Sequence, residues 1–306
     1  MEVFRDIGAY DGRPSAVCVG VFDGMHLGHR ALLGRLVDEA RARGLVSLAV
    51  TFEPHPRIVL SKGNDRVGLL SGPGEREALF EAAGVDRLAV IPFTREFSDV
   101  SAREFLATWL RDRLCARFLL LGYNHRFGGD DVPPECYVGL AASVGLEAAR
   151  AGVFTLADGG KVSSTAAREA LAGGDVAAAA RLLGRDYELS GVVVHGDALG
   201  RTFGVRTANV LPHDECRLIP ADGVYACWVA FGGEPHRAVV NVGSRPTVGG
   251  GERRIEAHVL DFDADVYGRE VTVAFRARLR GEMRFGGTAA LAGQIASDIA
   301  AARAAL

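Results

Sequence analysis

Two histidines lie close together in a glycine-rich segment near the N-terminus. Residues 20–29 read GVFDGMHLGH and join a short apolar run to a pattern typical of a helix. Glycines let the backbone approach a phosphate chain, and the free N–H groups at the start of a helix attract anions. An isolated H-x-G-H is more often two surface histidines in a turn. The strand–helix junction and the preceding G-V-F-D-G favour a phosphate-transfer site, in which His26 and His29 stabilise transition-state charge.

A second polar segment follows further along the chain. Ser163, Ser164 and Thr165 precede Arg168 by about one helical turn. Such a serine–threonine run is a common helix start, so capping alone would account for it. With Arg168 it is also a plausible clamp for ATP phosphates, since a guanidinium group matches phosphate geometry.

The first half of the chain alternates strand and helix patterns. Ser101 and Glu104 form an S-x-x-E capping box, and the helical pattern at residues 32–40 ends at Gly44. This alternation predicts an α/β fold with a doubly wound parallel sheet, whose ligands bind beyond the carboxyl ends of the strands. The apolar runs that predict buried strands are residues 16–21, 45–52, 87–93 and 117–123.

The pattern changes after about residue 186. Just before it, Asp175 begins a short alanine-rich helix that Gly184 ends. The later segments are short and strand-like, with Gly-, Pro- and Asp-rich turns between them, and they predict a small antiparallel β-barrel. A C-terminal helix is expected at residues 288–303. The expected strands are residues 189–195, 223–231, 237–242, 255–261 and 271–279.

Length and composition narrow the class of protein. The chain has 306 residues, enough for about two domains, and a formal net charge of −3 that offers no basic field for nucleic acid or an anionic membrane. The N-terminus lacks a basic, apolar leader, and no apolar run approaches the roughly 20 residues that span a bilayer. The five cysteines include no C-x-x-C pair and are expected to be reduced thiols. We expect a cytoplasmic, soluble protein of two domains.

The N-terminal half resembles the H-x-G-H nucleotidyltransferases, and in particular the adenylyltransferase half of bacterial bifunctional riboflavin kinase/FAD synthetases. Residues 51–56 (TFEPHP), 122–128 (GYNHRFG) and 183–187 (LGRDY) resemble further motifs of that family, as does the S-S-T-x-x-R segment. The resemblance implies flavin binding by Asn124 and His55. By their positions alone, Asn124 could instead form a turn before Gly128, and His55 could equally lie in a solvated loop. The ATP-binding residues it implies are Gly20, Phe22, Asp23, Gly24, His26, His29, Ser163, Ser164, Thr165 and Arg168.

The C-terminal half is similar to the riboflavin kinase part of the same family. Residues 196–209 (GDALGRTFGVRTAN), 241–247 (NVGSRPT) and 256–262 (EAHVLDF) match its motifs in order. The resemblance implies that Thr207 and Asn209 hold Mg²⁺, which accepts hydroxyl and amide oxygens. It also implies that Glu256 is the catalytic base, although an isolated glutamate would be read as a salt-bridged residue at a strand edge. The implied ATP-binding residues of the kinase are Gly196, Gly200, Arg201, Gly204, Thr207 and Asn209.

Three features depart from the family pattern. Arg206 stands where the family has a proline that presets the backbone of the phosphate loop. His125 replaces the usual aromatic residue after Asn124, and residues 129–137 lack the usual G-x-R-x-G-D pattern.

The resemblance implies a bifunctional enzyme with MgATP as co-substrate. Residues 1–185 would form the FMN adenylyltransferase domain and residues 186–306 the riboflavin kinase domain. Riboflavin would be phosphorylated to FMN, and FMN would then be adenylylated to FAD with release of pyrophosphate. Two alternatives stay open: an FAD synthetase whose kinase half is impaired by Arg206, and a non-catalytic regulator that binds flavin or nucleotide.

Overall fold

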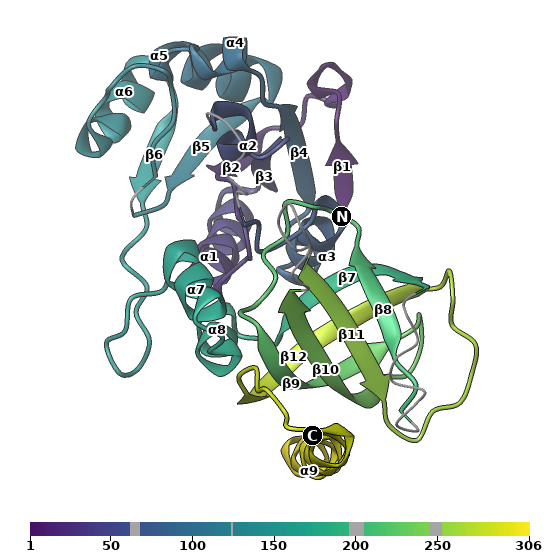
Figure 1. Ribbon diagram of the computed structural model, residues 1–306. Coiled ribbons are helices and arrows are strands. Elements are labelled where there is room, and N and C mark those ends of the chain that lie inside the picture. Colours follow the sequence, from purple (N-terminus) through teal and green to yellow (C-terminus); the bar gives the residue numbers. More distant parts are fainter. Residues whose placement is uncertain (62–67, 124, 196–204, 245–252) are drawn as a thin grey trace. The chain divides into compact units, whose positions relative to one another are not determined.

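A computed structural model describes residues 1–61, 68–123, 125–195, 205–244 and 253–306 (Figure 1). The chain forms two compact units. The first unit comprises Met1–Val67 and Ser71–Val162, and the second comprises Gly68–Leu70 and Ser163–Leu306. In the described part of the chain, no helix is both long and apolar enough to cross a membrane.

The first unit is built on a parallel sheet, which confirms the doubly wound α/β prediction. Its strand order is β1-β4-β3-β2-β5-β6, and every described pair of neighbours is parallel. The central strands are apolar throughout because both faces of the sheet are covered. The strands are β1 (Glu2–Phe4), β2 (Ser15–Val19), β3 (Val46–Glu53), β4 (Arg87–Pro92), β5 (Ala116–Leu121) and β6 (Glu147–Arg150).

Helices bury the two faces of this sheet in separate apolar clusters. Leu33 and Leu36 of α1 and Phe80 of α3 pack in one cluster, and Leu106 and Tyr137 belong to the other. Ser101 caps α5, which continues directly as a π-helix, η2. The helical segments are η1 (Ile7–Ala9), α1 (Leu27–Arg43), α2 (Pro56–Leu60), α3 (Pro73–Ala82), α4 (Arg95–Ser98), α5 (Ala102–Glu104), η2 (Phe105–Arg113), η3 (Pro134–Cys136) and α6 (Tyr137–Ser143).

The strand order creates one topological switch point. From β2 the chain continues to β3 and β4 on one side, whereas β5 and β6 lie on the other side of β2 (Figure 1). The loops that leave the carboxyl ends of β2 and β5 therefore run to opposite sides of the sheet. In open α/β sheets this divergence leaves the crevice where ligands bind.

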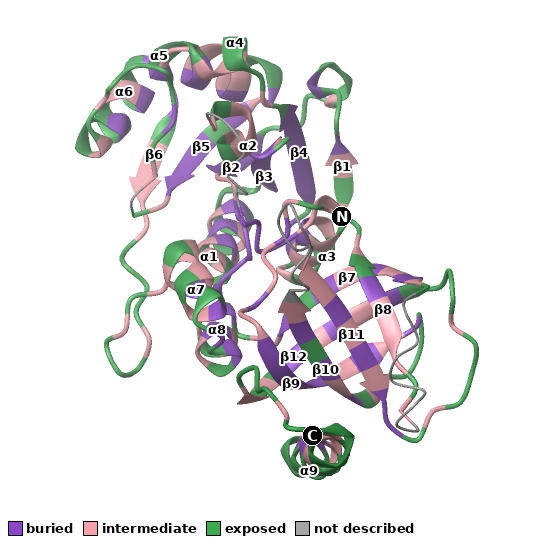
Figure 2. Cartoon of the chain, viewed as in Figure 1, coloured by how far each residue is buried: buried purple, intermediate pink, exposed green. Residues whose placement is uncertain are grey.

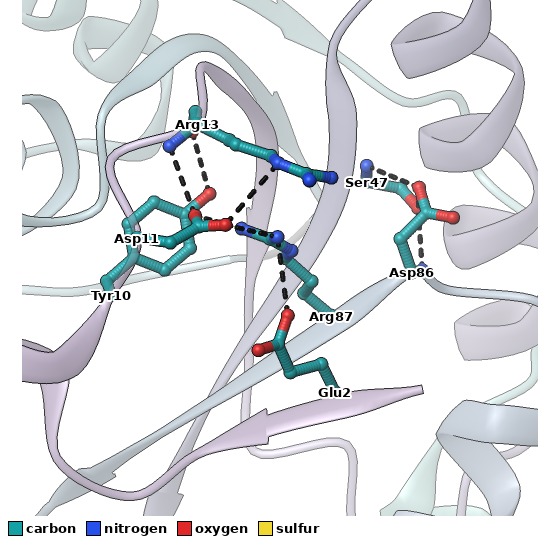
Figure 3. Close-up of polar contacts among 7 residues, drawn as sticks. All are labelled: Glu2, Tyr10, Asp11, Arg13, Ser47, Asp86 and Arg87. Atoms are coloured by element: carbon teal, nitrogen blue, oxygen red, sulfur yellow. Dashed lines mark hydrogen bonds and ion pairs between the residues drawn. The ribbon is translucent and has the colours of Figure 1, made fainter.

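The amino ends of the strands are joined by a polar cluster. Arg87, at the start of β4, has a side chain only 6% exposed, and its Nη2 lies 2.6 Å from Asp11 Oδ2 and 3.3 Å from Glu2 Oε2 (Figure 3). Nearby, Ser47 N and Oγ donate to Asp86 Oδ2 at 2.9 and 2.7 Å. The hydrogen bond from Arg87 lowers the pKa of Asp11 to about 2. This cluster lies at the end of the sheet opposite to the switch-point loops.

The second unit is a closed antiparallel barrel, as predicted. Its strand order is β10-β11-β8-β7-β12-β9, and buried residues alternate with partly exposed ones along β7 and β11 (Figure 2). The strands are β7 (Tyr187–Val194), β8 (Ala208–Pro212), β9 (Gly223–Ala230), β10 (His236–Ser244), β11 (Arg253–Val259) and β12 (Glu270–Arg280). The helices are α7 (Ser164–Ala172), α8 (Val176–Leu183) and α9 (Thr288–Ala305).

Two segments that precede the barrel in sequence belong to its core. Leu171 of α7 and Leu183 of α8 are fully buried in the barrel cluster, together with Leu70. The backbone at Leu69 bonds to both neighbours of Arg217: its N–H donates to the Cys216 carbonyl at 2.7 Å, and its carbonyl accepts from Leu218 N at 2.9 Å. The packing therefore places residues 68–70 and the chain from Ser163 onward in the second unit. The boundary between the two functional domains at 185/186 stays a prediction.

We expect Arg87→Ala to lower the free energy of unfolding of the first unit by about 2–4 kcal/mol, because it removes a buried side chain together with its ion pairs to Asp11 and Glu2. The control Arg13→Ala should change it by less than about 0.5 kcal/mol, since the Arg13 side chain is 66% exposed. Urea unfolding followed by Trp109 fluorescence, in a Trp228→Phe background, measures the difference.

The same pair has a defined pH dependence. Asp11 is depressed to a pKa of about 2 in the folded chain and returns to about 4 on unfolding. Its stabilisation is therefore complete above about pH 4 and is lost as the pH falls toward 2. If Arg87→Ala and Arg13→Ala lowered the free energy of unfolding equally at neutral pH, the stabilising role given to the pair of Arg87 and Asp11 would be wrong.

Candidate active sites

The first site is built on the loop between β2 and α1. His26 is the N-cap of α1, and its Nδ1 accepts a hydrogen bond from His29 N at 3.2 Å. The helix begins there because this imidazole nitrogen satisfies one of the free N–H groups of the first turn. A side chain at Gly28 would lie 3.2 Å from the His26 ring, so this position favours glycine.

The loop that carries these histidines has an unusual backbone. Phe22 and Met25 adopt positive φ angles of 52° and 40°, which non-glycine residues rarely do, and Gly24 between them has φ 77°. Asp23 is buried, and its Oδ1 accepts from Ser71 N at 3.0 Å and from Ser71 Oγ at 3.2 Å. Ser71 Oγ also accepts from Gly24 N at 2.9 Å. Asp23 and Ser71 therefore fix the loop. No motif in the sequence had singled out Ser71.

The two histidines form a stacked pair. Their ring centroids are 3.6 Å apart and their planes differ by 15°, while Phe22 meets His29 edge-on at 5.2 Å. Burial lowers the pKa of His26 to about 4. Burial, and then the nearby His26 and His125, lower the pKa of His29 well below its usual value. Both imidazoles are therefore neutral at pH 7 in the ligand-free protein.

The loop after β5 carries the other candidates of this unit. Asn124 lies outside the described residues, so its flavin-binding role stays a prediction. His125 follows it, and its ring lies 5.4 Å from that of Phe127. The divergent segment 129–137 is tied down at both ends: Asp130 Oδ1 accepts from Ala102 N at 2.6 Å, and Tyr137 Oη donates to the Phe127 carbonyl at 2.8 Å. This segment therefore supports the Phe127 end of the loop.

Other predicted residues are held by local contacts. His55 is buried as the N-cap of α2, where its Nδ1 accepts from Arg57 N at 3.0 Å. Ser163 caps α7 by accepting from Ala166 N at 3.1 Å. Arg168 Nε donates to the Gly68 carbonyl at 2.9 Å within the second unit. The capping interpretation of the serine run therefore holds for Ser163, and ATP binding by Ser163, Ser164, Thr165 and Arg168 stays a prediction.

The second site lies on the wall of the barrel. Asn209 of β8 is the register partner of Glu256 on β11, and Asn241 of β10 is its partner on the other side. Glu256 alternates with the buried Ile255 and Ala257, so it projects from the outer face of the barrel. Register partners share a face. One carboxylate is thus flanked by two amides across three strands.

Two cavities meet at Thr207, which lines both of them. The larger has a volume of about 680 Å³, and Glu256, Asn241 and His258 are among its lining residues. The smaller has a volume of about 410 Å³, and Asn209 and Tyr267 are among its lining residues. A phosphate donor in one cavity and a hydroxyl acceptor in the other would therefore approach each other beside Thr207.

The C-terminal helix forms the apolar wall of the larger cavity. Leu291 and Ile295 of α9 line it and are only partly buried. The helix is tied to the barrel by Arg280 of β12, whose Nε and Nη2 contact Asp298 at 3.0 and 2.8 Å. The side chains of this pair are 18% and 7% exposed, and Gln294 Nε2 also donates to Asp298 Oδ1 at 2.8 Å. The sequence motifs did not point to Asp298.

Arg206, the departure from the family's proline, does not fill either cavity. Its guanidinium pairs with Asp263 at the edge of the smaller cavity, and its side chain is 71% exposed. Its carbonyl oxygen lies 2.8 Å from His258 Nδ1. The remaining predicted ATP-binding residues of this half, Gly196, Gly200, Arg201 and Gly204, lie outside the described residues.

Comparison with known proteins identifies the family. The family models for FAD synthetase and riboflavin kinase match residues 9–166 and 183–306. The bifunctional riboflavin kinase/FMN adenylyltransferase of Escherichia coli K12 is 38% identical over 99% of this chain and 97% of its own length. The chain belongs to this family. Its Bacillus subtilis member is 32% identical over 93% of this chain and 90% of its own length.

A solved structure has the same fold over the whole chain. It is named a macrolide-efflux protein, from Streptococcus pneumoniae, and it superposes with a TM-score of 0.88 at 31% identity, covering 98% of each chain. The histidine pair therefore lies in the part of the chain that the FAD synthetase model matches, and Glu256 lies in the part that the riboflavin kinase model matches.

The buried histidines predict a loss of stability in mild acid. Since the pKa of His26 is about 4 when folded and about 6.5 when unfolded, the unfolded chain binds more protons between these values. The free energy of unfolding should therefore fall as the pH drops from 6.5 toward 4. His26→Asn keeps a capping oxygen and should reduce this fall by about 2 kcal/mol.

Urea unfolding at pH 7 and pH 5 tests this prediction, again with Trp109 as the probe. His195→Asn is the negative control: this exposed imidazole belongs to the second unit, so the variant should show the same fall as wild type. If His26→Asn and wild type lost equal stability between the two pH values, the imidazole would not be held neutral by burial.

Proposed function

We propose that the chain makes FAD from riboflavin in two ATP-dependent reactions. The barrel phosphorylates riboflavin to FMN, and the first unit transfers AMP from a second ATP to the FMN phosphate with release of pyrophosphate. The observation that carries the kinase assignment is the meeting of two cavities at Thr207, with Glu256 in the larger one. Riboflavin, FMN and ATP are small molecules, and the net charge of −3 offers no field for nucleic acid.

The chemistry of each cavity assigns its substrate. A flavin ring suits the larger cavity because Leu291 and Ile295 leave apolar surface for it. ATP then occupies the smaller cavity, so that its γ-phosphate points toward Thr207. Glu256 takes the proton of the terminal ribityl hydroxyl, whose oxygen attacks the γ-phosphorus while the bond to ADP breaks.

The residues beside Thr207 also fit a magnesium ion. A threonine hydroxyl and the Asn209 amide oxygen are hard oxygen ligands, and Mg²⁺ is usually held by few protein groups together with phosphates and waters. The ion would neutralise charge on the β- and γ-phosphates. Thr207 and Asn209 would hold it, and Gly196, Gly200, Arg201 and Gly204 would complete the ATP site.

Adenylyl transfer occurs at the switch-point loop of the first unit. A phosphate oxygen of FMN attacks the α-phosphorus of ATP, and the bond to pyrophosphate breaks without a covalent enzyme intermediate. His26 and His29 donate hydrogen bonds to phosphoryl oxygens, assisted by the N-terminus of α1. Gly20, Phe22, Asp23 and Gly24 shape the loop, Ser163, Ser164, Thr165 and Arg168 bind ATP phosphates, and Asn124 and His55 contact the flavin. We place both reactions in the cytoplasm.

A second candidate function is FAD synthesis with an impaired kinase. Arg206 replaces a proline, and its pairing with Asp263 holds a cation at the edge of the smaller cavity. Supplying FMN in place of riboflavin identifies this case, because a protein with an impaired kinase would form FAD from FMN but not from riboflavin. A non-catalytic regulator would bind flavin or nucleotide and form neither product.

The two reactions should be separable by single substitutions. Purified protein given riboflavin, ATP and Mg²⁺ should form FMN and then FAD, resolved by chromatography. Glu256→Gln removes the base and should lower FMN formation by about a hundredfold or more, while FMN is still converted to FAD. His26→Asn should lower the conversion of FMN to FAD, while riboflavin is still phosphorylated to FMN. Loss of both reactions in either variant would argue against two independent sites.

Anchoring of α9 should control flavin affinity. Asp298→Ala leaves Arg280 buried without its partner, which loosens the helix wall and should raise the dissociation constant of riboflavin about tenfold. The matched control is Asp261→Ala, which removes the other ion pair of α9, with Arg303, where the side chains are 41% and 64% exposed. Quenching of flavin fluorescence measures both. Equal affinities for the two variants would show that the buried pair does not shape the cavity.

A further inference from the structure

A third imidazole beside the histidine pair has no part in the mechanism above. Among the described residues, His125 Nε2 and His29 Nδ1 are buried and have no hydrogen-bond partner. Leaving a buried polar nitrogen unpaired costs free energy, so such groups require an explanation. These two nitrogens come from loops far apart in sequence, one after β2 and one after β5.

The strand order explains why the two loops meet. β2 and β5 are parallel neighbours at the switch point, so their carboxyl ends lie at the same edge of the sheet (Figure 1). In open α/β sheets ligands bind at this point. His125 is close enough to His29 that a proton on its ring would lower the pKa of His29. The unpaired nitrogens therefore lie on the loops at the switch point, where the first unit is expected to bind phosphates.

The surroundings of His125 favour an anionic partner. Arg150, at the end of β6, donates through Nη1 to the carbonyls of Gly122 and Tyr123 at 3.3 and 2.9 Å, and it also bonds to the Pro134 carbonyl. Among the described residues, the acceptors of its guanidinium are neutral carbonyl groups, so it retains a positive charge near His125. Burial and this positive charge lower the pKa of His125 to about 4. A phosphate group would satisfy the unpaired nitrogen and lie in this positive potential.

We propose that His125 is a third phosphate-contacting residue of the adenylyl-transfer site, donating a hydrogen bond through Nε2–H to a phosphoryl oxygen. The inference rests on the proposed adenylyltransferase function of the first unit. The donor acts together with His26 and His29 and needs no covalent step. Its nitrogen distinguishes this chain from relatives with a carbon ring at the same position of the motif.

Two substitutions separate hydrogen bonding from the filling of space. His125→Phe keeps a flat ring and removes the nitrogen, whereas His125→Gln removes the ring and keeps an N–H group near the Nε2 position. We expect His125→Phe to lower kcat/KM for FAD formation from FMN by about tenfold to a hundredfold, the usual effect of losing a hydrogen bond to a charged group. His125→Gln should retain more activity than His125→Phe. Riboflavin phosphorylation by the same preparations is the internal control and should not change.

A second measurement detects the imidazole without turnover. Binding of a polyphosphate beside His125 raises its pKa, so MgATP binding near pH 6 should take up protons. Calorimetric titration of the full chain, in buffers of different ionisation enthalpy, measures this uptake. Wild type should take up more protons than His125→Phe, and the kinase site contributes equally to both.

The proposal would be overturned if His125→Phe matched wild type in FAD formation and in proton uptake, because the ring would then only fill space. Greater activity of His125→Phe than of His125→Gln would overturn it for the same reason. Failure of the adenylyltransferase function itself looks different, since wild type would then form no FAD from FMN while proton uptake on MgATP binding still differed between wild type and His125→Phe.

Discussion

The pairing of β2 with both β3 and β5 is the constraint on which the first active site depends. Parallel strands direct their following loops to one edge of the sheet, and reversal of the strand order separates those loops into a crevice. The loop after β2 then needs positive φ at Phe22 and Met25 to bring His26 to the start of α1. Asp23 and Ser71 stabilise this conformation through buried hydrogen bonds. The catalytic geometry thus follows from strand order first and from side-chain chemistry second.

The site on the barrel is positioned by strand register and by one helix. Antiparallel register places Asn209 and Asn241 on either side of Glu256. The partly exposed Leu291 and Ile295 of α9 form one wall, which the buried pair of Arg280 and Asp298 holds in place. Preorganisation here comes from a rigid sheet and one anchored helix.

Much of the fold could be predicted because its signals are local. The runs that form β2 to β5 are apolar on both faces, and the capping residues Ser101 and Asp175 mark helix starts. The short strands β1, β6 and β8 were missed, since Glu147–Arg150 and Ala208–Pro212 carry no apolar run and acquire their pairing only from neighbours. Sequence motifs predicted His26 and Glu256 as site residues. They could not show the proximity of His29 and His125, which depends on the strand order, or the bond from Ser71 to Asp23.

One feature of the second unit bears on how the chain could be divided. Leu70 lies in the barrel core, and the backbone at Leu69 bonds on both sides of Arg217, although both residues come from within the first half of the sequence. The barrel is therefore a non-contiguous folding unit. A gene cut at the 185/186 junction would remove Leu171 and Leu183 from its interior as well. The interior of the barrel thus draws on residues 68–70 and on α7, which lie before the segment that the riboflavin kinase model matches, residues 183–306.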